Sequence, residues 1–218
     1  MADPKLESIF SFMPELPSMP GADDRLFGPQ EEVANNGALV NWSSSEWSLY
    51  ASGYKEAGDV LVNKVENRSS GHDVLVYPIL FLYRQYLELY LKLSIRTVRI
   101  FLDEGREIPT GHRIELLWEQ LDGLYRRAFP GESTDALDQT GRLIREFAAV
   151  DPQSTAFRYP VDLKGNPSLP ELHSIDLVNV RDVIAKMDML LGGAHTQAYE
   201  HLQWKLEMER EFRDDNCY

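Results

Sequence analysis

The sequence predicts an all-α protein, a bundle of about five helices with one long central helix. Three observations predict this fold. The 218 residues suit a single core, and 43% of them are hydrophobic, which is enough to fill it. Apolar residues recur at helical spacing in the segments between residues 43 and 200. The longest such segment is apolar over most of its helical circumference, as expected for a helix surrounded by others.

The chain is expected to divide into three parts. Residues 1–41 are rich in Pro, Gly, Asn and acidic residues and predict an irregular N-terminal arm. Residues 42–200 form the helical bundle, and residues 201–218 form a charged helical C-terminal tail. Within the arm, the apolar segment 9–17 (IFSFMPELP) is expected to dock on the bundle or on a partner, the bundle being the simpler choice.

The first helix follows Ser43–Ser45, whose hydroxyl groups favour an N-cap, and ends near the turn at 67–71. Its expected inward face consists of Trp47, Tyr50, Tyr54, Ala57, Leu61 and Val65. The second and longest helix is expected from about Asp73 to Gly105, with Pro78 accommodated in the first turn.

The third helix is expected from about His112 to Phe129. Its expected core positions are Ile114, Leu117, Leu121, Leu124 and Tyr125. The fourth helix follows an N-cap at Ser133 or Thr134 and ends at Asp151. Its expected core positions are Leu137, Ile144 and Phe147.

Residues 152–173 contain four prolines and predict either a proline-rich loop or a short hairpin before the last helix. That helix is expected to start at Ser174 or Asp176. Glycine is a poor helix former, so a kink or break is expected at Gly192–Gly193.

The single cysteine, Cys217, excludes an internal disulfide and suits a reducing compartment. The N-terminus lacks the continuous apolar stretch of a signal peptide, and charged residues interrupt the longest apolar run. A cytoplasmic location without membrane contact is therefore expected.

A polar stripe follows the second helix. Its members share one sector at helical spacing and are Arg84, Glu88, Lys92, Arg96 and Arg99. Because the rest of this helix is apolar, Arg84 and Glu88 are expected to be at least partly buried. They form either an ion pair that satisfies itself or a site in which the arginine holds a phosphate and the glutamate orients it.

A second polar group lies after the fourth helix and consists of Asp151, Ser154, Arg158 and Tyr159. One interpretation is structural: Asp151 caps the turn and Arg158 pairs with a core acid such as Glu88. The alternative is a substrate-binding loop on a rigid scaffold.

Histidines supply the remaining candidates. His112 and His72 each suit a capping role or general acid/base chemistry. His195 and His201 are six residues apart, which is not the i,i+4 spacing of a shared metal site. The sequence contains no glycine-rich phosphate loop of the familiar types, so neither a metal nor a cofactor is expected.

Three segments resemble bacterial proteins of the HEPN type, named for nucleotide binding in higher eukaryotes and prokaryotes. They are YPILFLYRQYLELYLKL (77–93), GHRIELLWEQL (111–121) and DPQSTAFRYP (151–160). The resemblance covers roughly residues 45–200. It implies a helical bundle that forms a homodimer. It also implies either a metal-independent ribonuclease of a toxin–antitoxin or antiphage system, or a non-catalytic partner of a nucleotidyltransferase.

The chain departs from the ribonuclease motif of that family, in which a histidine follows an arginine and a polar residue by four to six positions on one helix. Arg84 and Gln85 suit the first two places, but no histidine follows at that distance. Arg106 and His112 match the spacing, yet Pro109 and Gly111 lie between them and predict a loop.

Two functions from different classes follow. The first is a HEPN-like effector acting on RNA, with Arg84, Glu88 and His112 as catalytic residues. Its expected phosphate-binding or substrate-binding residues are Lys92, Asp151, Arg158 and Tyr159. The second is a non-catalytic dimeric interaction protein whose acidic ends engage a protein partner, such as a basic antitoxin or a nucleotidyltransferase. The net charge of −13 favours the second, since affinity for nucleic acid comes mostly from basic residues.

Overall fold

The computed structural model describes residues 19–27, 37–40, 46–68, 70–131 and 133–215. Contacts divide the chain into residues 1–42 and 43–218, and each unit is considered by itself. In the first unit, residues 21–24 form a turn in which the Gly21 amide donates to the Asp24 carboxylate. The apolar segment 9–17 and the expected N-cap at Ser43–Ser45 lie outside the described residues.

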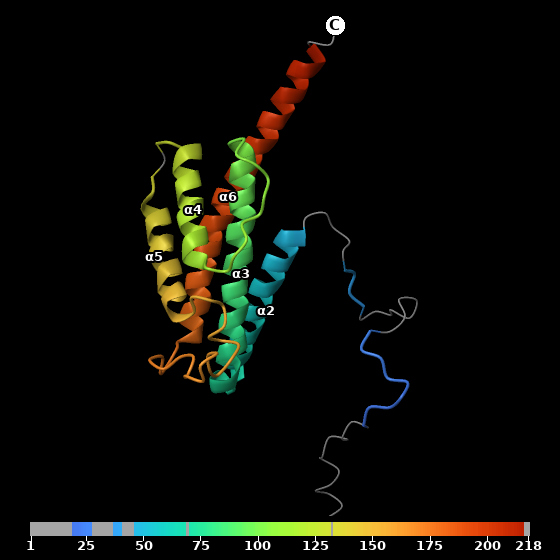
Figure 1. Cartoon of the computed structure of the whole chain (residues 1–218), viewed down its shortest axis with the longest axis vertical. Helices are drawn as coiled ribbons and strands as arrows, with labels where there is room; N and C mark the ends of the chain where they lie inside the picture. The colour runs from blue at the N-terminus through green and yellow to red at the C-terminus, as the bar shows by residue number, and fades with distance from the viewer. Residues whose placement is uncertain (1–18, 28–36, 41–45, 69, 132, 216–218) are drawn as a thin grey trace, which may run out of the picture. The chain divides into compact units, whose positions relative to one another are not determined.

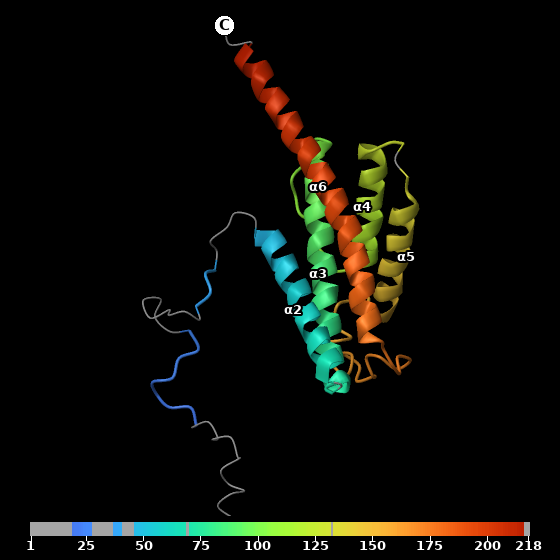
Figure 2. The same cartoon turned by 180° about the vertical axis from the view of Figure 1, so that it is seen from behind.

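The second unit is an all-α bundle, as predicted, and no strand occurs in the described part of the chain (Figure 1). Its helices are α2 (Glu46–Arg68), α3 (His72–Phe101), α4 (Ile114–Ala128), α5 (Asp135–Val150) and α6 (Leu177–Asp215). Helix α3 lies in the middle and packs against α2, α4 and α6, while α5 packs mainly on α4 (Figure 2). None of the described helices is long and apolar enough to cross a membrane.

Helix α3 is buried along most of its length. Its fully buried apolar side chains include Ile79, Tyr83, Leu87, Leu91, Ile95 and Val98. Each such side chain contributes roughly 1.5–3 kcal/mol when it leaves water, which explains why this helix is the centre of the core. It ends at Phe101, four residues before the predicted end at Gly105, and Pro78 lies in its second turn instead of the first.

The inward face of α2 differs from the prediction. Tyr50 and Ala57 are exposed, whereas Ala51 and Val62 are buried; Val65 is buried as predicted. The reason is a close approach at Gly58, where an added Cβ would lie 2.8 Å from a ring carbon of Tyr83. The Tyr83 ring can pack there only because Gly58 has no side chain, and this contact fixes the rotation of α2.

The core positions predicted for α4 are all buried, and Ile144 of α5 is buried with them. The predicted start of α4 at His112 is wrong by two residues, because the helix begins at Ile114. His112 therefore lies in the loop that precedes α4. Thr134 occupies the N-cap position of α5 but makes no capping hydrogen bond to the backbone.

The predicted break at Gly192–Gly193 is absent, since α6 continues through both glycines to Asp215. Gly192 lies beside α3, with its Cβ position 3.7 Å from the Tyr90 hydroxyl, and Leu191, Ala198 and Leu202 are buried on either side. This packing outweighs the helix cost of about 1 kcal/mol per glycine. Residues 201–215 are thus the continuation of α6, and its end extends past the other helices (Figures 1 and 2).

Residues 152–176 form an irregular segment between α5 and α6. Of the two predicted forms, the proline-rich loop is therefore observed and the short hairpin is not. An isolated β-bridge joins Val161 and Pro167, but no hairpin strands flank it. The turn between them is held by Asp162, whose carboxylate accepts the amides of Lys164 and Asn166 at 2.8 and 2.9 Å.

A polar layer fixes α2 and α6 on α3. The hydroxyl of Tyr83 donates to Asp59 of α2 at 2.7 Å, and that of Tyr86 donates to Asp188 of α6 at 2.6 Å. Lys55 forms ion pairs with both carboxylates at 3.0 and 3.6 Å. Burial, reinforced by these hydrogen bonds, raises the pKa of both tyrosines well above the usual value.

This layer should make stability fall at alkaline pH. The folded state holds the Tyr86 proton more tightly than the unfolded state, so the free energy of unfolding decreases as the pH rises above about 10. Tyr86→Phe should cost about 1 kcal/mol near neutral pH and reduce the alkaline slope. Urea denaturation followed by circular dichroism at about pH 8 and about pH 10.5 measures both effects. An unchanged slope would exclude Tyr86 as its source.

Candidate acid–base site under the α3–α4 loop

The α3–α4 loop, residues 102–113, runs back along α3 from its carboxyl end to the start of α4 (Figure 1). Arg99 of α3 donates to the carbonyl of Glu107 at 3.5 Å, and Arg84 donates to the carbonyl of His112. Gly111 has a φ of +96°, which favours glycine and turns the chain immediately before His112. The loop therefore packs along the polar stripe of α3, in which Arg84, Glu88 and Lys92 are buried and Arg96 and Arg99 are partly exposed.

Arg84 is fully buried and uses its donors within the protein. Its Nη2 donates to the His112 carbonyl, its Nε donates to the Asp151 carbonyl at 3.4 Å, and its Nη1 lies 3.5 Å from Glu88 Oε2. The guanidinium thus joins α3 to the α3–α4 loop and to the end of α5. One expectation was that Arg84 holds a phosphate, but its guanidinium is enclosed and already paired. We therefore assign Arg84 a positioning role.

Glu88 is the centre of the cluster. Its side chain is 3% exposed, and Oε1 lies 2.9 Å from Lys92 Nζ and 2.8 Å from His112 Nδ1. A carboxylate accepts hydrogen bonds only, so the His112 ring donates through Nδ1. Glu88 therefore fixes the position and the tautomer of His112.

His112 is the part of the cluster that reaches solvent. Its side chain is 68% exposed, although Glu88 beneath it is buried. With Nδ1 held by the carboxylate, Nε2 is the ring nitrogen left for a substrate. A carboxylate that orients an imidazole in this way is an arrangement used for general acid/base catalysis.

The buried charges balance each other. Arg84 and Lys92 are cations, while Glu88 and Asp151 are carboxylates, and all four side chains are buried. Burial lowers the pKa of Arg84, and the charges of Glu88 and Asp151 oppose that shift. Such a cluster tolerates the low-dielectric interior because Glu88 is paired with Arg84 and Lys92, while the Asp151 carboxylate accepts two backbone amides.

Asp151 joins the two groups of residues that the sequence singled out. Its backbone carbonyl accepts from Arg84, and its Oδ1 accepts the amides of Thr155 and Ala156 at 2.8 and 3.0 Å. The predicted capping role is therefore observed. Asp151 and Lys92 are both enclosed, which places neither of them at a surface where a phosphate could bind.

Arg158 and Tyr159 lie apart from this cluster. The structure does not pair Arg158 with Glu88 as expected, because Arg84, Lys92 and His112 already surround that carboxylate. Instead the Arg158 guanidinium lies over the rings of Phe81 and Tyr159, 5.8 and 5.2 Å from their centroids. Among the predicted catalytic residues, Arg84, Glu88 and His112 are brought together.

Other histidines have different surroundings. His201 packs against the rings of Phe101 and Phe129, and His195 lies edge-on to Tyr90. Burial lowers the pKa of His195. In the described part of the chain, no group of three or more His, Cys, Asp or Glu side chains is placed to hold a metal ion.

The sequence indicated Arg84, Glu88 and His112 as members of the site, but not that the α3–α4 loop packs over them. The only signals for the position of this loop were the glycines and the proline of residues 105–111, which predicted a loop without indicating where it lies.

No protein-family model, curated protein or solved structure matches this chain.

Proposed function

We propose that the chain is an effector acting on RNA, a metal-independent ribonuclease in which His112 is the acid–base group. The observation that carries this proposal is the 2.8 Å contact between His112 Nδ1 and the buried Glu88 carboxylate, with the imidazole otherwise exposed. The resemblance to HEPN proteins of toxin–antitoxin and antiphage systems supports it. The usual helical histidine of that family would here be replaced by one from the α3–α4 loop.

The chemistry follows from the oriented imidazole. Neutral His112 takes the proton of a ribose 2′-hydroxyl through Nε2, and the 2′-oxygen attacks the adjacent phosphorus. The bond from phosphorus to the 5′-oxygen breaks, water supplies a proton to that oxygen, and the hydroxide left behind takes the proton from the His112 imidazolium. The products are a 2′,3′-cyclic phosphate and a 5′-hydroxyl end. Glu88 stabilises the imidazolium that forms. Arg84 holds α3 and the α3–α4 loop together, and so keeps Glu88 beside His112.

Contacts to RNA would be few. Arg106 and Arg113 are exposed cations in the same loop as His112, and Arg113 also pairs with Glu115. The net charge of −13 opposes broad electrostatic binding. We therefore propose that the protein contacts only a short stretch of RNA and that added salt weakens this binding.

Incubation of the purified chain with total RNA in EDTA tests the proposal. We expect cleavage that leaves 2′,3′-cyclic phosphate ends and is weakened by added salt. RNA that stays intact at high protein concentration would reject the ribonuclease.

The exposed end of α6 favours a second candidate, a dimeric interaction protein. Trp204 is 64% exposed in the C-terminal half of α6. Exposed aromatic side chains are enriched at protein interfaces. A homodimer, or a complex with an antitoxin or a nucleotidyltransferase, would use this surface. Light scattering of the wild type and Trp204→Ala measures self-association, and a wild-type monomer at micromolar concentration would exclude the homodimer.

A further inference from the structure

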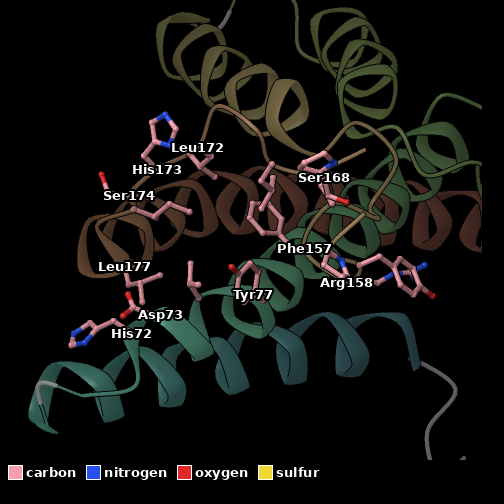
Figure 3. Close-up of a pocket in the computed structure, with 17 residues that line it drawn as sticks. His72, Asp73, Tyr77, Phe157, Arg158, Ser168, Leu172, His173, Ser174 and Leu177 are labelled. Atoms are coloured by element: carbon pink, nitrogen blue, oxygen red, sulfur yellow. The ribbon is translucent and has the colours of Figure 1, made fainter. Parts of the chain in front are cut away.

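A pocket of about 650 Å³ lies beside the first two turns of α3, and His112 is not among the residues that line it (Figure 3). Its walls come from α3, from residues 156–160 and from residues 167–177. Its volume is in the range of sites that enclose a small organic molecule. No part of the proposed acid–base chemistry uses these residues.

One end of the pocket carries a cation, Arg158, whose guanidinium has no hydrogen-bond acceptor among the described residues. The Arg158 guanidinium is held by the rings of Phe81 and Tyr159. It forms no ion pair with any carboxylate in the described part of the chain. Stacking on aromatic faces leaves the N–H groups at the edge of the guanidinium for another partner. A planar fork of this kind suits a carboxylate or a phosphate.

The position of Arg158 is set in advance by the core. Buried Asp151 accepts the amides of Thr155 and Ala156, and the Thr155 carbonyl accepts the amides of Arg158 and Tyr159 at 3.0 and 3.1 Å. The turn that presents Arg158 is therefore ordered before any ligand arrives. Such preorganisation reduces the entropy that binding must overcome.

The rest of the pocket has an apolar middle and a polar far end. Phe157 and Tyr77 lie between Arg158 and a group formed by His72, Asp73, His173 and Ser174 (Figure 3). Asp73 and Phe81 are eight residues apart on one helix, so the two ends are separated by about 12 Å. A ligand with one or two rings and a polar group opposite its anion has this length.

We propose that this pocket binds a small aromatic anion, with its carboxylate or phosphate on Arg158 and its ring against the half-exposed side chain of Tyr77. The apolar middle favours a ligand with a ring over an inorganic anion, since only a ring would cover the exposed part of Tyr77. The site is independent of His112, so it stands or falls separately from the proposed ribonuclease.

Fluorescence titration with 8-anilinonaphthalene-1-sulfonate tests the site, because this probe is an oxyanion on a fused ring. We expect saturable binding of one probe per chain. Arg158→Ala should weaken it by about tenfold or more, the loss of one charge-assisted contact. Arg142→Ala is the matched control, since Arg142 is an exposed arginine of α5 paired with Glu146. Circular dichroism shows whether each variant is folded.

Displacement by three naphthalene compounds identifies the anion. Naphthalene-1-carboxylate and 1-naphthyl phosphate should displace the probe at lower concentrations than neutral naphthalene-1-methanol, and Arg158→Ala should remove this difference. The better anion shows whether a carboxylic acid or a phosphate ester is the preferred class. Equal displacement by all three compounds, probe binding unaffected by Arg158→Ala, or the absence of saturable binding would each overturn the proposal.

Discussion

Replacing Arg84 by alanine is expected to lower the free energy of unfolding by about 3–5 kcal/mol. The change leaves the buried Glu88 carboxylate without one of its cations. It also removes the N–H groups that donate hydrogen bonds to the His112 and Asp151 carbonyls. Three elements lose their common anchor, because the guanidinium joins α3, the α3–α4 loop and the end of α5. Urea denaturation followed by circular dichroism measures the loss.

Arg126→Ala is the matched control for this prediction. Arg126 also contacts two carboxylates, Asp122 and Asp138, but it is exposed. Exposed ion pairs contribute little to stability, so the denaturation midpoint of this variant should stay close to that of the wild type. Equal destabilisation by the two substitutions would contradict the structural importance assigned to the buried cluster.

Replacing His112 by alanine is expected to reduce the rate of RNA cleavage by about 10²- to 10⁴-fold, the usual contribution of a general acid or base. Stability should change little, because the His112 side chain is largely exposed. The contact with Arg84 also survives, since it uses the backbone carbonyl of His112. The measurement is the cleavage of an end-labelled RNA in EDTA, with the denaturation midpoint recorded beside it.

Thr110→Ala separates this effect from a general disturbance of the loop. Thr110 is exposed two residues before His112, and neither an ion pair nor a hydrogen bond is recorded for its side chain in the described structure. This variant should cleave RNA at the wild-type rate. A His112→Ala protein that still cleaves as fast as the wild type would remove His112 from the chemistry.

The polar stripe of α3 could be predicted because it depends on one helix alone. The i,i+4 spacing of Arg84, Glu88 and Lys92 places them in one sector, and the apolar remainder of the helix implies burial. The structure confirms the burial predicted for Arg84 and Glu88, and Lys92 is buried beside them. The same local reasoning located the core positions of α4.

The partner of the stripe could not be predicted in this way. His112 reaches Glu88 across 24 positions of sequence, through a loop whose path depends on tertiary contacts. Helical spacing made Arg106 and His112 resemble a motif, although they belong to this loop. A histidine partner for Glu88 therefore exists although no histidine follows Arg84 on the helix.

Other differences also arise from packing between helices. The rotation of α2 depends on the fit of Tyr83 against Gly58, and the continuity of α6 through Gly192 depends on its contact with α3. Hydrophobic periodicity describes each helix alone and gives no information on such pairs. The position of Arg158 is a similar case, since the carboxylate expected to bind it was already surrounded by three other groups.

The protonation state of the two His112 ring nitrogens tests the contact with Glu88 most directly. Nitrogen-15 correlation spectra of the histidine rings report which nitrogen carries the proton. His72, which has no side-chain hydrogen bond recorded in the described structure, provides an internal reference. For neutral His112 we predict a proton on Nδ1 and a bare Nε2, because the Glu88 carboxylate can only accept. A His112 ring protonated on Nε2, or one whose shifts match those of His72, would contradict the proposed acid–base site.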